Sequence, residues 1–185
     1  MLDWLRVAIA HYVPEPYAVT LSTIGADGCL DARVLVLKDV SDDAVCEIAT
    51  GDRSAKGRQL AANPACALSV YWSPLARAVR LRGVAERASA ATAAADFRAR
   101  ALEARVLALA GRQSAPLPGP AERDRLLADA RQLLEAQPDL VDPGWTVWRV
   151  RPVSVEFWQG DPSRHHLRLR YDRTEVGWNR SCLWA

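Results

Sequence analysis

Three short segments of this 185-residue sequence combine cationic and hydrogen-bonding side chains in patterns that could bind an anion. They are residues 33–38 (RVLVLK), residues 50–56 (TGDRSAK), and the pair formed by residues 156–160 (EFWQG) and 164–168 (RHHLR). Guanidinium and ammonium groups bind carboxylates and phosphates through charge-assisted hydrogen bonds. The sequence therefore predicts a local anion site, in a chain whose formal charge of +2 is too small to indicate nucleic acid.

The second segment has the features of a phosphate site at the start of a helix. Ser54 is placed to cap a helix over residues 54–63, and Lys56 lies in its first turn, ahead of the helix stop at Pro64. Free backbone N–H groups, the helix dipole and a nearby cation together favour a phosphate monoester. A simple capped helix start would explain Ser54, but it would not require Lys56.

Lysine is rare enough in this chain to be informative. Only Lys38 and Lys56 are lysines among 24 basic residues, so arginine fills nearly every other cationic position. A retained lysine suggests a site that needs a compact ammonium group, although two ordinary surface lysines would give the same count. On a strand, Arg33 and Lys38 point to opposite faces unless a bulge intervenes, so they would serve different parts of a site.

The histidines and cysteines do not predict a metal centre. His165 and His166 are adjacent and would face opposite sides of a strand, so they cannot easily share one ion. The four cysteines are widely spaced without a CxxC pair, which is typical of free thiols; they are Cys29, Cys46, Cys66 and Cys182.

The elements that must position these residues are mostly strands. Alternating apolar and β-branched residues predict strands over 17–24, 29–38, 44–50, 65–72, 77–87, 145–150, 153–158, 167–171 and 177–183. Helical spacing predicts an N-terminal helix within residues 1–13, and the segment 89–136 is a helical insertion with helices over 89–112 and 121–136. This order favours an antiparallel barrel over a parallel doubly wound sheet.

The composition indicates one globular domain over residues 1–185, ending in the strands of 145–184. Half of the residues are apolar and a quarter are charged, and there is no linker or internal repeat. No apolar run is long enough to cross a membrane, and the N-terminal stretch lacks the layout of a cleavable signal. A cytoplasmic protein without membrane contact is expected.

Five motifs in the expected order resemble the pyridoxamine 5'-phosphate oxidase family across residues 14 to 184. They are RVLVLK, SAKGRQLAANP, the W-x-P-L-x-R-x-V-R-x-R-G hairpin of residues 72–83, Gln113-Ser114, and EFWQG followed by R-x-H-x-R. The resemblance implies a mainly β fold, an antiparallel FMN-binding split β-barrel with peripheral helices. It also implies a homodimer that binds FMN at the subunit interface.

The resemblance further implies which residues contact FMN and which contact the substrate. FMN would be bound by Arg33, Val34, Leu35, Val36, Leu37, Ala49, Thr50, Ser54 and Lys56 of one subunit, and by Gln113, Ser114, Trp158 and Arg168 of the other. A small phosphorylated pyridine would be held by Lys38, Arg100, Arg164 and His166, with Arg164 and His166 orienting its reactive end as the catalytic pair.

Four positions depart from the pattern of the family. Asp96 and Ala104 stand where the family has a tyrosine and a serine in the substrate phosphate pocket, and an inward Asp96 would repel a phosphate. Ala55 and Ala78 replace an arginine and a glutamine that contact FMN. The cofactor is therefore better supported than the substrate.

Three functions follow from this resemblance. The first is an FMN-dependent oxidase that moves a hydride from C4' of pyridoxine or pyridoxamine 5'-phosphate to FMN, with O2 as acceptor, giving pyridoxal 5'-phosphate and H2O2. The second is an oxidase of a specialised, phenazine-type metabolite, which the loss of the tyrosine and serine favours. The third is a non-catalytic flavin- or haem-binding split barrel. Whether Asp96 faces the cavity or solvent discriminates between the first two.

Overall fold

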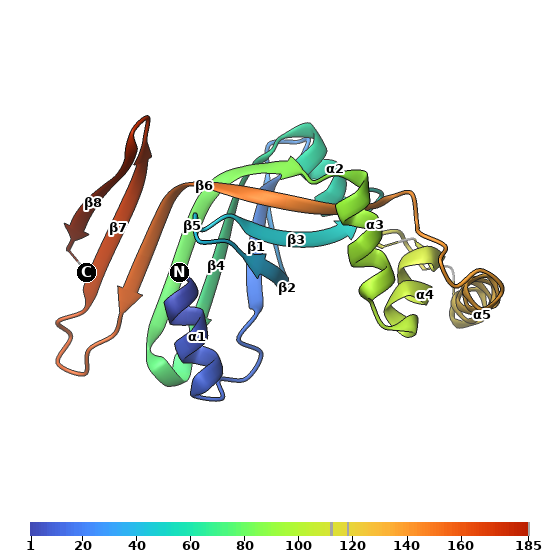
Figure 1. The fold of residues 1–185 in the computed structure, drawn as a ribbon, viewed down its shortest axis with the longest axis horizontal. Helices are drawn as coiled ribbons and strands as arrows, with labels where there is room; N and C mark the ends of the chain where they lie inside the picture. Colours follow the sequence, from blue (N-terminus) through green and yellow to red (C-terminus); the bar gives the residue numbers. More distant parts are fainter. Residues whose placement is uncertain (112, 118, 185) are drawn as a thin grey trace.

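The computed structural model of the chain describes residues 1–111, 113–117 and 119–184. Figure 1 shows strands in the centre, a helical region at one end and a strand pair at the other. The helices are α1 (Leu2–Ala10), α2 (Ala55–Ala62), α3 (Ala90–Ala99), α4 (Leu102–Ala110) and α5 (Pro120–Ala136), with a 3-10 turn over Ser73–Leu75. The strands are β1 (Ala18–Ile24), β2 (Leu30–Val40), β3 (Cys46–Gly51), β4 (Ala65–Trp72), β5 (Arg77–Arg87), β6 (Trp145–Gln159), β7 (Leu167–Thr174) and β8 (Gly177–Leu183).

Six of the strands close into an antiparallel barrel. The sheet order is β3-β2-β1-β4-β5-β6-β7-β8, and an additional β3–β6 pairing joins the two sides of the barrel. Strands β7 and β8 continue the sheet beyond the barrel from the far end of β6, as Figure 1 shows. The predicted antiparallel barrel with a helical insertion is confirmed.

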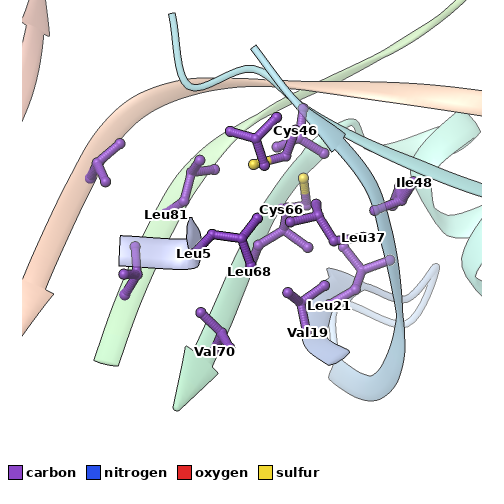
Figure 2. Close-up of a cluster of buried hydrophobic side chains, with 14 of the residues drawn as sticks. Leu5, Val19, Leu21, Leu37, Cys46, Ile48, Cys66, Leu68, Val70 and Leu81 are labelled. Atoms are coloured by element: carbon purple, nitrogen blue, oxygen red, sulfur yellow. The ribbon is translucent and has the colours of Figure 1, made fainter. Parts of the chain in front are cut away.

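Alternation along the strands fills the barrel with apolar side chains. Strand β1 buries Val19, Leu21 and Thr23 on one face, and β4 buries Cys66, Leu68 and Val70 in the same way. Figure 2 shows the apolar side chains of this set, without Thr23, meeting Leu37, Cys46 and Ile48 and the α1 residue Leu5. Burial raises the pKa of Cys46 to about 12 and that of Cys66 to about 11, so both behave as apolar core residues.

The prediction of one long helix over residues 89–112 is wrong, because this segment forms two helices, α3 and α4. Position 112 lies outside the described residues. Arg100 and Ala101 take extended ψ values of 148°, which end α3 and let α4 start in a new direction. The break allows each helix its own partner. Phe97 of α3 packs edge-on against Trp145, with ring centroids 5.8 Å apart, whereas Val106 of α4 packs with α5 in a second apolar cluster.

Strand β6 is longer than predicted. Two strands, 145–150 and 153–158, were expected on either side of Pro152, but one strand runs through it. The pairing with β5 skips one residue at this point, since Gly83 pairs with Pro152 and Arg82 with Ser154. The unpaired residue is Val153, so the bulge lies in β6 beside the proline, where its missing N–H is tolerated. A side chain at Gly83 would collide with the backbone of Arg151.

The other predicted elements agree with the structure to within three residues at each end. The turn signal at residues 25–28 joins β1 to β2, where Gly28 has a φ of 77° and the Asp27 carboxylate accepts a hydrogen bond from the Cys29 N–H. Within the described residues, no helix is both long and apolar enough to span a membrane.

Candidate functional site

A cavity of about 710 Å³ lies between the barrel wall and the helical insertion. The wall is formed by β2 and β3, the floor by the start of α2, and the roof by α4 and the segment after it. Predicted site residues that line it are Val34, Leu35, Val36, Lys38, Ala49, Thr50, Ser54, Lys56, Arg100 and Gln113. Most of the predicted contacts thus meet in one place, although they come from five separate parts of the chain.

The start of α2 at this cavity is built as predicted. The Ser54 hydroxyl accepts a 3.0 Å hydrogen bond from the Gly57 N–H, which is the N-cap interaction, and it also contacts the Thr50 hydroxyl at 3.1 Å. Gly57 lets the helix approach the end of β3, because a Cβ atom there would lie 2.5 Å from the Gly51 carbonyl oxygen. The positive end of the helix dipole therefore faces the cavity.

Lys56 is the clearest candidate for an anion contact. Only 8% of the residue is exposed, and no described residue forms a hydrogen bond or ion pair with its ammonium group. Burial and then the nearby charge of Arg33 lower the pKa of Lys56. A buried ammonium without a counter-ion is costly, so this position favours an anionic ligand.

Arg33 stands beside this cavity but does not line it. Its guanidinium donates to the Thr23 hydroxyl at 2.6 Å and the Gln59 side-chain oxygen at 2.9 Å, and it forms an ion pair with Asp31. Lys38, by contrast, lines the cavity, so the two cations lie on opposite faces of β2 as the strand period predicts. Leu37 is 3% exposed and its side chain lies in the barrel core.

Gln113 and Ser114 were expected to reach the cofactor from a partner subunit, and the structure corrects this expectation. The Thr50 hydroxyl donates to the Gln113 side-chain oxygen at 3.4 Å, and the Ser114 hydroxyl accepts from the Ala55 N–H at 3.2 Å. The insertion folds back over β3 and α2, and it brings Gln113 to the cavity of its own chain and Ser114 to the start of α2 beside it. Ser114 has a φ of 74°, an uncommon conformation for a non-glycine residue that often marks functional segments.

Asp96 faces inward, toward the cavity lysine. Its Oδ1 atom forms an ion pair with Lys38 Nζ at 2.8 Å, and its Oδ2 atom accepts a hydrogen bond from Trp145 Nε1 at 2.8 Å. Only 13% of the Asp96 side chain is exposed. Arg100 lies over the Trp145 ring at 4.3 Å, and its buried Nε has no hydrogen-bond partner among the described residues.

The remaining predicted residues gather at the opposite end of β6. The Trp158 ring lies 5.0 Å from the His166 ring, and Arg168 pairs with Trp158 across the β6–β7 ladder. His166 Nδ1 accepts a hydrogen bond from the Asp161 N–H at 3.0 Å, so neutral His166 carries its proton on Nε2 and can donate it. Arg164 is exposed in the preceding loop with a φ of 66°.

Glu156 holds Arg168 in place, a role that sequence reasoning did not assign. Its carboxylate accepts from Arg168 Nε and Nη2 at 3.1 and 2.9 Å and from Arg80 at 2.8 Å. Burial alone would raise the pKa of Glu156, but the hydrogen bonds from Arg168 and Arg80 outweigh it and lower the pKa. A lone glutamate within a buried strand, opposite arginines on both neighbouring strands, was the available signal.

The two groups of residues are too far apart to serve one ligand within a single chain. Trp145, at the cavity, begins β6, and Trp158 lies 13 residues further along the same strand. That separation corresponds to roughly 40 Å of strand. Figure 1 shows the helical insertion at one end of β6 and the β7–β8 pair at the other.

The fold defines the class of protein, an antiparallel split barrel with a cavity lined by cationic side chains, and sequence comparison gives the family. The family model described as "Pyridoxamine 5'-phosphate oxidase" matches residues 5–159, and the one described as "Pyridoxine 5'-phosphate oxidase C-terminal dimerisation region" matches residues 145–185. The chain therefore belongs to the pyridoxamine 5'-phosphate oxidase family, a family of oxidases whose cofactor is FMN.

Individual relatives and structures agree with this assignment. The chain is 42% identical over 178 residues to the pyridoxine/pyridoxamine 5'-phosphate oxidase of Bordetella pertussis, covering 95% of this chain and 82% of that protein. It is 43% identical over 182 residues to the enzyme of the same name from Thermosynechococcus vestitus, covering 98% and 85%. PhzG from Burkholderia lata, solved with tetrahydrophenazine-1-carboxylic acid, has a TM-score of 0.93 at 26% identity, covering all of this chain and 90% of that chain.

The residues present fit FMN. The unpartnered Lys56 and the start of α2 suit its phosphate, and the apolar side chains of Val34 and Val36 suit a flat aromatic ring, whereas the Leu35 side chain packs against the barrel core. The cavity carboxylates do not oppose this, since Asp52 is bound by Arg87 at 2.9 Å and Asp142 lies 3.8 Å from Arg53.

Proposed function

We propose that this chain is an FMN-dependent oxidase that converts pyridoxine 5'-phosphate and pyridoxamine 5'-phosphate to pyridoxal 5'-phosphate. The observation that carries the proposal is that one cavity holds two cationic centres, Lys56 with the start of α2, and Lys38 with Arg100. Two anions can bind there, one from the cofactor and one from the substrate. The names of relatives that share over 40% identity support the choice of substrate.

When bound, FMN supplies the acceptor for a hydride and passes the two electrons to O2. The alcohol substrate loses a hydride and a proton from its C4' group and becomes the aldehyde, while O2 becomes H2O2. The amine substrate takes up water in addition and releases ammonia. In this proposal Lys56, Thr50 and Ser54 hold the cofactor phosphate end, and Lys38 with Arg100 holds the substrate anion.

The proposal places Arg164, His166, Trp158 and Arg168 of a second subunit over the same cavity. The match of residues 145–185 to a dimerisation region supports a homodimer, and the length of β6 explains why a partner is needed. The Nε2–H of His166 can then donate a hydrogen bond to the substrate, and Arg164 can hold its reactive end in place. The four free thiols are compatible with a cytoplasmic location, which we include in the proposal.

A second candidate substrate is a phenazine-type metabolite that carries a carboxylate. The ion pair between Asp96 and Lys38 favours it, because it removes one positive charge from the substrate end of the cavity. The similarity to PhzG, which was solved with a tricyclic carboxylic acid, points in the same direction.

Addition of each substrate to the purified, FMN-loaded protein tests the proposal. Bleaching of the flavin absorbance without oxygen, and stoichiometric peroxide in air at micromolar pyridoxine 5'-phosphate, are expected. Turnover of only a dihydrophenazine carboxylate would support the second candidate instead. A yellow protein that oxidises neither the pyridine phosphates nor the dihydrophenazine carboxylate would contradict both candidate functions and favour a non-catalytic flavin carrier.

A further inference from the structure

The substrate end of the cavity contains a carboxylate that competes for its lysine. Asp96 Oδ1 lies 2.8 Å from Lys38 Nζ, and the Asp96 side chain is 13% exposed. The Lys38 side chain is 34% exposed, so solvent screens the pair in part, and Asp96 offsets part of the Lys38 charge before any ligand arrives. An incoming anion must therefore share Lys38 with Asp96.

Arg100 is then the cation left for a ligand at this end of the cavity. It lines the cavity, forms no ion pair within 4 Å among the described residues, and has a buried Nε without a partner. Burial lowers the pKa of Arg100, and the charge of Asp96 partly offsets this effect. A single guanidinium can match one negative charge, but it cannot by itself match the two that a phosphate monoester carries near neutral pH.

The Asp96 side chain makes two interactions in this cavity, and a substitution can remove one and keep the other. One is its charge, which acts on Lys38. The other is its hydrogen bond from Trp145 Nε1, which orients the ring beneath Arg100. Asparagine keeps an oxygen for Trp145 and the shape of the side chain but removes the charge.

We propose that Asp96 is a specificity-determining residue that lowers the preference of this cavity for a phosphate dianion and lets it accept substrates with a single negative charge, such as a carboxylate. The inference rests on the proposed function of the same site, because it concerns the substrate end of that cavity. It applies whether the ring of the substrate is a pyridine or a larger aromatic system.

The test compares two ligands that share the same pyridine ring and differ only in their anionic group. Pyridoxal 5'-phosphate and a pyridoxal analogue with a carboxymethyl group in place of the phosphate are titrated calorimetrically into the FMN-loaded protein and its Asp96→Asn variant. We expect Asp96→Asn to tighten binding of the phosphate ligand about tenfold or more, the effect of one charge-assisted hydrogen bond, and to change binding of the carboxylate less than about threefold. Asp96→Ser, which also lacks the charge, should act in the same direction if the asparagine variant folds poorly.

Glu86→Gln is the matched control, because it removes a carboxylate from an exposed ion pair with Arg151 away from the cavity. It should leave both dissociation constants unchanged. An unchanged or weaker phosphate affinity in Asp96→Asn, or equal tightening of both ligands, would overturn the inference. The dissociation constants are measured without turnover, so the two proposals can fail independently. A wild-type protein that does not oxidise pyridoxine 5'-phosphate would refute the proposed substrate, whereas the effect of Asp96→Asn on the two dissociation constants would still test the role of Asp96.

Discussion

The two lysines of the chain differ in their counter-ions, and this difference defines the two ends of the cavity. Lys38 is paired with Asp96 at 2.8 Å, whereas no described residue pairs with the ammonium group of Lys56. A protein that keeps a buried cation unpaired loses stability in its ligand-free form. Lys56 therefore indicates a residue retained for its ligand.

Replacing Lys56 with methionine should weaken FMN binding and stabilise the apoprotein. We expect the dissociation constant of FMN to rise roughly 10- to 100-fold, the value of a hydrogen bond to a charged group. The melting temperature of the apoprotein should rise, because the buried charge is removed. Fluorescence titration and thermal unfolding measure the two effects, and Arg58→Ala on the exposed side of α2 is the control. A Lys56→Met variant with unchanged FMN affinity would refute the role of Lys56.

The lowered pKa of Lys56 also predicts how the stability of the apoprotein varies with pH. The unfolded chain binds this proton more tightly than the native state, so it holds more protons between the lowered pKa and the ordinary value of 10.5. The Lys56 contribution therefore makes the apoprotein more stable as pH rises through that window. The difference in unfolding free energy between wild type and Lys56→Met should shrink over the same range.

Glu156 should also make the protein more stable as pH rises, but in the acid range instead of the alkaline range. Its pKa is lowered below the ordinary 4.5, so its contribution is complete above that value and is lost as pH falls through the lowered pKa. The difference in unfolding free energy between wild type and Glu156→Gln should be constant near neutral pH and decrease in acid. A difference that grows as pH falls would contradict the assigned ion pairs with Arg168 and Arg80.

At the scale of elements, the approach of α2 to β3 sets the shape of the phosphate end of the cavity. This approach requires Gly57, whose Cβ position would lie 2.5 Å from one backbone oxygen and 2.9 Å from another. The helix would have to move to accept any side chain there.

Gly57→Ala should destabilise the protein by about 1–3 kcal/mol, as overpacking usually does. FMN affinity should fall as well, because the N–H groups at the start of α2 move with the helix. Gly51→Ala is the matched control for stability, since nothing lies within 4 Å of its Cβ position. Equal melting temperatures for the two variants, measured by calorimetry, would show that α2 does not depend on this contact.

The elements also show why some of the fold could be predicted from sequence and some could not. The Ser54 cap and the 25–28 turn depend on local chemistry, and both were found. The break between α3 and α4 was missed because residues 99–102 are all acceptable in a helix. It exists because Phe97 and Arg100 pack on Trp145, 45 or more residues away in sequence.

For the candidate site, the identities of the residues could be predicted from the sequence, but several of the contacts between them could not. The motifs named the residues of both groups, because their types and order are local features of the sequence. The ion pair of Lys38 with Asp96, the positioning of Arg168 by Glu156, and the placement of Gln113 over its own chain's cavity were not predictable. Each depends on tertiary contacts between segments that are distant in sequence.

At the scale of the whole molecule, β6 connects two half-sites. Its start closes the barrel beside the cavity, and its end carries Trp158 and leads to Arg164 and His166. In the proposed homodimer, the cavity of one subunit therefore receives the second group of residues from its partner, and the dimer holds two composite sites.

Complementation between two inactive variants tests this central claim most directly. A heterodimer of a Lys56→Met chain and an Arg164→Ala/His166→Ala chain, isolated with two different tags, contains one site with both groups intact. With FMN at a concentration that fills wild type but not Lys56→Met, we predict about half of the wild-type oxidase activity for this heterodimer, and almost none for either parent homodimer. A heterodimer no more active than its parents, beside a fully active heterodimer of two tagged wild-type chains, would contradict the account.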